Sequence, residues 1–436
     1  SRVFSACCFC RAPKTSTLKS GSSTPMSLQH KVVAVVVLAI LEATIAYPLI
    51  GTYMPVSNVH EHSQINLDVK EFEAALAGSS PDYDAAKAIY ENGGGHSCKS
   101  ATNPRTLQGF ATKNLAGESF ADAFYGSGLA TDFWNTWFLA AFAGTGEFAG
   151  LSRTKRVTSL KKGAMGLVTF YASHELEAAI VKAAGSSGPT DSGSGHAWDE
   201  GWAFYYGTDG TTSPYTVAGK RDANFPTGTV VQTGIVPYFN KGLIAVRSGT
   251  YSDTDAKANR DIIYKMWVIT YLRAAFKYLE ISERSYGDKA HAEGYAYYKA
   301  IDGWVASKNS SAAQIMRDAL AITQTSISSG TYCAAKAAME AAYPALGIDC
   351  GMMGTWTDSS VTLTVCSTAC SAATVTLPAG ASAVIGVVGS QTDVTCAPGS
   401  APAPAPASIP ASSAFSVVPG FIVSLIACIA VGLKLA

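Results

Sequence analysis

The sequence has no excess of either charge, since its 32 Lys and Arg residues are matched by 32 Asp and Glu residues. Proteins that attract nucleic acid or anionic lipid electrostatically carry a basic excess, so we expect no nucleic-acid partner. Several catalytic motifs are also missing. The chain has no Gly-x-Ser-x-Gly elbow, no His-Glu-x-x-His zinc motif and no phosphate-binding Gly-x-x-x-x-Gly-Lys loop. We therefore expect a binding protein and not an enzyme.

The N-terminal end has the layout of an export signal. Residues 1–25 show no periodicity, whereas Met26 begins a short basic segment followed by the apolar run 32–41 and by small residues up to Ala46. About ten apolar residues are too few to cross a bilayer but suit a secretory signal peptide. We expect translation to start at Met26 and residues 1–46 to be absent from the mature protein.

The C-terminal end indicates attachment to a membrane. Residues 397–414 are rich in Pro and Ala and are predicted to form an extended linker. Residues 415–436 are almost entirely apolar up to Lys434, which suits either a transmembrane anchor or a cleaved GPI signal. The sequence leaves both anchors open.

The cysteines between the two ends agree with export: Cys98, Cys333, Cys350, Cys366, Cys370 and Cys396. An even number in an exported chain predicts disulfides, and no paired CxxC motifs indicate a structural zinc site. Within residues 351–396, the segments 361–365 and 374–377 alternate like strands. We predict a small disulfide-linked β segment near the C-terminus.

Helical periodicity dominates the rest of the chain. Apolar residues recur at three- and four-residue spacing in 72–76, 84–90, 160–184, 261–279 and 312–325. Clusters of Gly, Ser and Asp separate these segments. The sequence therefore predicts a mainly α protein.

The chain also repeats itself. The segment His196–Tyr206 aligns with His291–Tyr298, so that Glu200-Gly201 falls on Glu293-Gly294. Weaker matches on both sides keep the same order along the chain, which chance would not do. We predict two related helical-bundle lobes, 47–230 and 231–350, that arose by internal duplication.

The first copy of the repeat carries candidate metal ligands. His196 and Glu200 are four residues apart and share one helix face, with Asp199 beside it. His174 and Glu177 are three apart on the preceding predicted helix, so Glu177 is expected to face Glu200 across the bundle. Plain core packing explains the surrounding aromatic residues equally well.

The second copy is chemically different. His291 and Glu293 are only two residues apart and cannot share a helix face in the same way, although both remain candidate ligands. We read His60-Glu61-His62 as a loose terminus and Glu118 as part of a solvated helix face. Carboxylates with imidazole or phenolate, and no free thiolate, suit a hard cation such as ferric iron.

The stretch from Gly195 to Phe225 resembles the algal low-iron-inducible periplasmic iron-assimilation proteins, the phytotransferrin-like group. It reads His-Ala-Trp-Asp-Glu-Gly-Trp-Ala-Phe-Tyr-Tyr-Gly, then Ser213-Pro-Tyr, then Gly219-Lys-Arg-Asp-Ala-Asn-Phe. The resemblance covers residues 60–350. It implies an extracytoplasmic protein that concentrates ferric iron for uptake, with carbonate as a synergistic anion.

These observations lead to one main hypothesis and two alternatives. The protein is expected to bind ferric iron without catalysis at the outer face of the plasma membrane, chiefly in the first lobe. An inert adhesion module on a Pro/Ala stalk is the first alternative. A surface hydrolase or di-iron oxidase is the second, although the Glu-x-x-His pairs of di-iron bundles are not present in both lobes.

Overall fold

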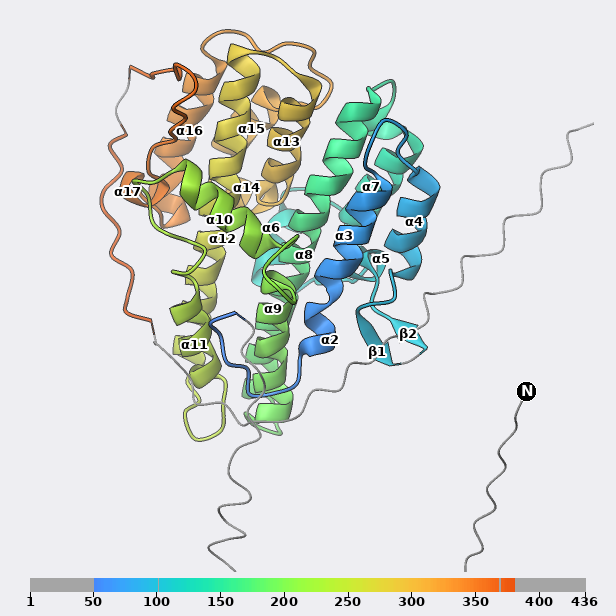
Figure 1. Cartoon of the computed structure of the whole chain (residues 1–436). Helices are drawn as coiled ribbons and strands as arrows, with labels where there is room; N and C mark the ends of the chain where they lie inside the picture. The colour runs from blue at the N-terminus through green and yellow to red at the C-terminus, as the bar shows by residue number, and fades with distance from the viewer. Residues whose placement is uncertain (1–50, 101, 368–369, 381–436) are drawn as a thin grey trace, which may run out of the picture.

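The computed structural model describes residues 51–100, 102–367 and 370–380 (Figure 1). The predicted leader 1–46, linker 397–414 and tail 415–436 lie outside these residues, as does Cys396. Among the helices that the structure describes, none is both long and apolar enough to cross a membrane. The fold is mainly α-helical, which confirms the fold class expected from the periodicity.

The N-terminal part is built from short elements: α2 (His60–Ser63), α3 (Ile65–Ala75), α4 (Tyr83–Asn92), β1 (Cys98–Ser100), β2 (Asn103–Pro104), α5 (Leu107–Ala111), α6 (Ser119–Gly126), α7 (Phe133–Ala143) and the 3-10 turn η1 (Gly146–Phe148). The strands β1 and β2 pair antiparallel and form the only sheet of the described residues. Helices α3, α4, α5 and α7 of this part lie along one side of the molecule (Figure 1).

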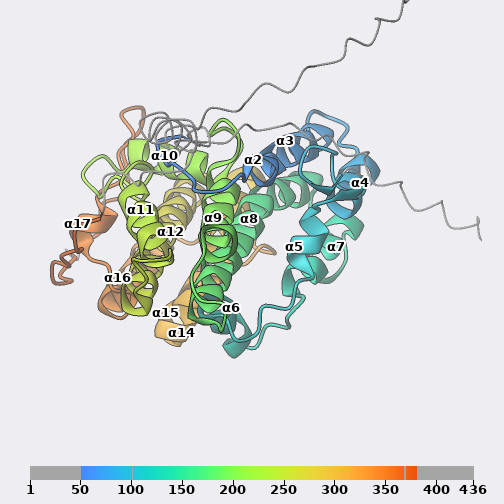
Figure 2. The same cartoon turned by 90° about the horizontal axis from the view of Figure 1, so that it is seen from below.

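Two long helices form the centre of the molecule, as Figures 1 and 2 show. Helix α8 (Arg153–Ala184) and helix α12 (Asp253–Arg284) each have 32 residues. Each is followed by a short helix that packs against it, α9 (His196–Tyr206) after α8 and α13 (Asp288–Lys299) after α12. The predicted duplication requires such an arrangement, in which each half has one long helix followed by one short helix.

The ends of these helices follow from local sequence. The side chain of Ser152 accepts a hydrogen bond from the N–H of Lys155 at 3.2 Å, and Ser252 accepts one from Asp255 at 3.2 Å. Serine is a favoured N-cap because its oxygen satisfies a free N–H group of the first turn. Gly207 ends α9 with a φ of 82°, a conformation that favours glycine.

A glycine in each short helix allows close packing against its long neighbour. A Cβ atom at Gly201 would lie 2.7 Å from Leu176 Cδ2 of α8. At Gly294 it would lie 2.9 Å from Leu320 and 3.2 Å from Tyr278 Cβ of α12. Real Cβ contacts are essentially never as short as 2.7 or 2.9 Å. The glycine of the repeat is therefore a packing element in both halves.

The remaining elements are η2 (Asp191–Gly195), α10 (Pro214–Asn224), α11 (Val236–Ala245), α14 (Asp302–Lys308), α15 (Ser310–Ala319), α16 (Thr331–Leu346) and α17 (Cys350–Met353). Buried apolar side chains from Tyr53 to Met353 form one contiguous core. Helix α13 packs against both α8 and α12, and α14 packs against α6. The two predicted lobes therefore share a core, and their boundary at residue 230 stays a prediction about the sequence.

One helix is shorter than its periodicity predicts. The segment 312–325 was expected to be helical, but α15 ends at Ala319. Beyond it, the carbonyl groups of Ile322 and Gln324 accept hydrogen bonds from the buried Nζ of Lys155 at 2.8 and 2.5 Å. A buried ammonium group needs such acceptors, and carbonyls inside a helix are already bonded, so the chain leaves the helix here.

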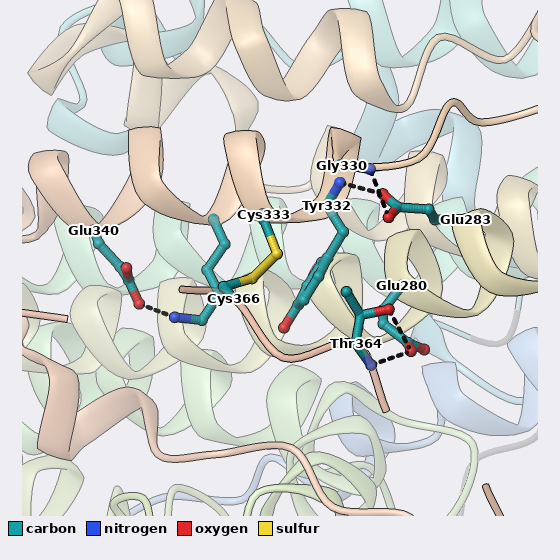
Figure 3. Close-up of a disulfide and its surroundings, with 9 residues drawn as sticks. Glu280, Glu283, Gly330, Tyr332, Cys333, Glu340, Thr364 and Cys366 are labelled. Atoms are coloured by element: carbon teal, nitrogen blue, oxygen red, sulfur yellow. Dashed lines mark hydrogen bonds and ion pairs between the residues drawn. A yellow bond between two sulfur atoms is a disulfide. The ribbon is translucent and has the colours of Figure 1, made fainter. Parts of the chain in front are cut away.

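Disulfides tie the C-terminal segment to the helices. Cys333 of α16 is bonded to Cys366, as Figure 3 shows, and Cys350 of α17 is bonded to Cys370. Cys98 is also disulfide-bonded. The expected disulfide link is therefore confirmed.

The strands expected in this segment do not form. Residues 361–365 and 374–377 are extended but pair with no strand in the described part of the chain. One N–H group in each segment is bonded to a side chain instead. The N–H of Thr364 donates to Glu280 at 3.1 Å, and the N–H of Val375 donates to Asp349. The residue types alternate along these segments because one face of the chain packs against the helices.

Candidate metal centre

The first site-bearing helix starts from an unusual turn. Residues Asp191–Gly195 form a π-helical turn, η2, that runs directly into α9 at His196. Arg247 holds Asp191 at 2.8 Å, and the hydroxyl of Ser194 donates to the carbonyl of Val246 at 2.6 Å. Turns of this kind often occur at functional sites. Here the turn fixes the position at which α9 presents His196.

Three side chains meet beside this turn. His62 of α2 contacts Glu200 Oε1 through Nε2, and His196 Nε2 lies 3.2 Å from the same oxygen. One ligand atom from each of these three residues lies within 4.8 Å of the others, and the described residues contain no second group of this kind. Helices α2 and α9 lie side by side in Figures 1 and 2. The helical spacing of His196 and Glu200 therefore does place both in one cluster.

Asp199 has a different role from the one expected. It is fully buried and accepts hydrogen bonds from the hydroxyl of Tyr53 at 2.6 Å and from the N–H groups of Val56 and Ser57 at 2.9 Å each. The Ser57 hydroxyl also contacts Asp199, at 2.7 Å, and lies 2.8 Å from His196 Nδ1. Asp199 therefore holds the segment before α2 in place and, through Ser57, orients the imidazole ring of His196.

The cluster holds its groups in the protonation states that a metal needs. Burial alone would raise the pKa of Glu200, but hydrogen bonds from His196 and His62 outweigh it and hold the pKa well below the usual value. Burial lowers the pKa of His62 to about 4, so this ring is neutral at pH 7. Metal ligands must be deprotonated, and both residues already are.

A second carboxylate lies next to the first. Burial, together with the charge of Glu200, raises the pKa of Glu175 well above its usual value. This shift favours the protonated form of Glu175, whose side chain hydrogen-bonds to Glu200. The residue of α8 that faces Glu200 is thus Glu175 and not the expected Glu177.

One cation borders the cluster. Arg105, in the loop before α5, contacts His62 Nε2 and donates to the carbonyl of Cys98. The side chain of His62 is 8% exposed and that of Glu200 14%, whereas His196 is 30% exposed. The cluster is therefore open to solvent on the side of His196, beside a positively charged group.

The other candidates of the first lobe have separate partners. His174 Nδ1 lies 2.6 Å from Glu118 Oε1, so Glu118 takes part in a partly buried pair instead of a solvated face. Glu177 accepts from Arg260 at 2.7 Å and from Tyr264 at 3.2 Å, which are both on α12. Neither His174 nor Glu177 belongs to the cluster.

The candidates of the second lobe do not meet. Glu293 lies 3.8 Å from Lys162 of α8. His291 is fully buried beside Tyr286, and its Nε2 has no hydrogen-bond partner within the described part of the chain. Burial lowers the pKa of His291 to about 4. The two residues point to different neighbours, as their two-residue spacing predicts.

Sequence reasoning missed three members of this site. His62 was assigned to a loose terminus, although the His-x-His spacing was a usable signal. Glu175 differs from the chosen Glu177 by about half a helical turn, which sequence spacing alone cannot resolve. Arg105 reaches the site from a loop and leaves no pattern in the sequence.

Comparison with known proteins identifies the group to which this site belongs. No curated protein and no solved structure matches the chain. The model of one family, described as low iron-inducible periplasmic protein, matches residues 28–377. This range includes the whole cluster and both copies of the repeat. The chain therefore belongs to the family of low iron-inducible periplasmic proteins.

Proposed function

We propose that this protein binds ferric iron without catalysis, through His62, His196 and Glu200. The observation that carries the proposal is the convergence of two imidazoles and a carboxylate in a chain of a low-iron-inducible family. Glu175 is the fourth ligand in this proposal and loses its proton to solvent when the ion enters. Carboxylate oxygens are harder ligands than imidazole nitrogens, so their presence favours a highly charged ion.

The charges around the cluster support carbonate as a second ligand. Ferric iron and Arg105 together carry four positive charges, and the ionised forms of Glu175 and Glu200 with a carbonate dianion carry four negative charges. A buried site is stable only when its charges are compensated. The guanidinium of Arg105 has the planar geometry that binds an oxyanion in bidentate fashion.

A second candidate function follows from the same ligands. Two histidines and one carboxylate are also the ligand set of ferrous oxygenases with open coordination positions. Such an enzyme would consume oxygen when loaded with ferrous iron, whereas the proposed carrier would not. An inert adhesion module would bind neither ion.

A ferric titration of the mature protein tests the proposal. Calorimetry with ferric citrate, in buffers with and without bicarbonate, is expected to show saturable binding that weakens when bicarbonate is removed. Glu200→Gln removes the central ligand and is expected to weaken binding by about 100-fold or more. Glu293→Gln changes the aligned residue of the other repeat and is the matched control, with affinity preserved within about threefold. Absence of binding at micromolar iron, or equal affinity in Glu200→Gln and the wild type, contradicts the proposal.

We further propose that the protein works on the outer side of the plasma membrane, held there by residues 415–436. The family description supports a periplasmic location. Treatment of intact cells with a phosphatidylinositol-specific phospholipase distinguishes the two anchors, because only a GPI-linked protein is released. The proposed anchor is wrong if the protein is recovered in the medium without any treatment.

A further inference from the structure

A cavity of about 430 Å³ lies between helix α16, the end of α12 and the disulfide-tied C-terminal segment. Its volume falls within the usual range for small-molecule sites. It is distinct from the metal centre, because no residue of α2, α8 or α9 lines it. Five aromatic side chains form much of its wall: Phe225, Phe276, Tyr332, Tyr343 and Trp356.

The five rings that line the cavity are called the aromatic box below. The rings of Phe276 and Tyr332 are nearly perpendicular, at 87°, with centroids 6.3 Å apart. Of the five rings, only Phe225 has a cation over its face within the described residues, namely Arg273 at 5.6 Å. The indole N–H of Trp356 is buried and has no acceptor in the described part of the chain. Within that part of the chain, the box therefore combines four rings that have no cation over them with one unused hydrogen-bond donor.

Carboxylates lie near one ring of the box, and Figure 3 shows Glu280 and Glu283 close to Tyr332. Glu283 accepts from the N–H of Gly330 at 2.9 Å and from the N–H of Tyr332, so it caps α16. Glu280 is fully buried and accepts from Thr364. Burial and the charges of Glu280, Glu340 and Glu283 all raise the pKa of Tyr332. Glu280 is itself paired with Arg284, at 3.3 Å.

One cation lines the cavity, but it is already paired. Lys336 forms an ion pair with Glu340 one helical turn away, and both side chains line the cavity. The aromatic faces attract a cation through their quadrupoles, and the nearby carboxylates add to that attraction. Of the three carboxylates, Glu340 lines the cavity, where it would repel an anion and would add nothing to the binding of a neutral ligand.

We propose that this cavity binds a small organic cation of the trimethylammonium type. The ligand's cationic head lies in the aromatic box beside Glu340, and its oxygen accepts from the indole N–H of Trp356. The two disulfides hold the covering segment in place, so the site exists before the ligand arrives and little ordering is needed on binding. This site is independent of iron.

Choline and its neutral carbon isostere, in which a tert-butyl group replaces the trimethylammonium group, provide the test. Both have the same shape, so only charge distinguishes them. In calorimetric titrations of the full mature protein, we expect choline to bind about tenfold more tightly than the isostere. Equal affinities would show a merely apolar pocket and overturn the proposal, as would the absence of choline binding at millimolar concentration.

Variants of the ion pair separate recognition from folding. Glu340→Gln leaves the Lys336 ammonium unpaired next to the ligand and is expected to weaken choline binding. Lys336→Met removes that positive charge and is expected to strengthen it. Tyr332→Leu should weaken binding about tenfold, whereas Tyr251→Leu removes a ring outside the cavity and should change nothing. Effects of the same sign in the two charge variants would contradict the proposal.

Discussion

The hydrogen bonds of Asp199 allow a prediction with a calculable magnitude. Asp199→Ala leaves the buried N–H groups of Val56 and Ser57 without an acceptor. An unsatisfied buried donor costs about 1–3 kcal/mol, so the substitution should lower the free energy of unfolding by about 3–5 kcal/mol. Asp199→Asn keeps one oxygen for both N–H groups, while Tyr53 can turn its hydroxyl to accept from the amide. This variant should lose only about 1 kcal/mol.

Urea denaturation followed by circular dichroism measures both changes, and the order of the two variants is the main test. A loss below about 1 kcal/mol in Asp199→Ala would refute the reasoning. Iron titration adds a second test, because Asp199 lies outside the cluster. Asp199→Asn should keep its iron affinity within about threefold, whereas the loss of a true ligand would weaken binding about 100-fold.

Three further predictions concern the core and the cluster. The pKa of His62 is lowered to about 4, so its contribution to stability is present above pH 6.5 and is lost as the pH falls toward 4. Thermal melting of the wild type should show this loss, about 3 kcal/mol in size, and His62→Gln should reduce it. Gly201→Val should lower the free energy of unfolding by about 1–3 kcal/mol in a urea titration, because its side chain meets Leu176; no change would mean that α8 and α9 can separate freely. Arg273→Met should cost about 3–5 kcal/mol in the same assay because it leaves the carboxylate of Asp222 without its buried cation, and a neutral result would show that the pair is dispensable.

The helical architecture could be predicted from the sequence, because the spacing of apolar residues along a helix is a local pattern. The 3.6-residue period located most of α8 and α12, without their first turns, and the repeat located the matched short helices. The end of α15 could not be predicted, because it depends on Lys155, which is distant in the sequence. The C-terminal strands were predicted from alternation alone, which does not show whether a partner strand exists.

Only part of the candidate metal cluster could be predicted, again because sequence patterns report local structure. His196 and Glu200 share a face by their spacing on one helix. His62 joins them only through the packing of α2 on α9, which no local pattern encodes. The choice between Glu175 and Glu177 depends on the rotation of α8 about its axis, and only the position of Gly201 against Leu176 fixes that rotation.

The shared core has a consequence for how this protein can be made and changed. Duplicated proteins are often separable, because each copy retains a core of its own. Here α13 lies against α8, so a fragment ending near residue 230 would expose the apolar face that α13 covers. The second copy therefore gives structural support to the half that contains the proposed binding site. Substitutions throughout the second copy should therefore alter the cluster indirectly, through stability, while leaving its ligands untouched.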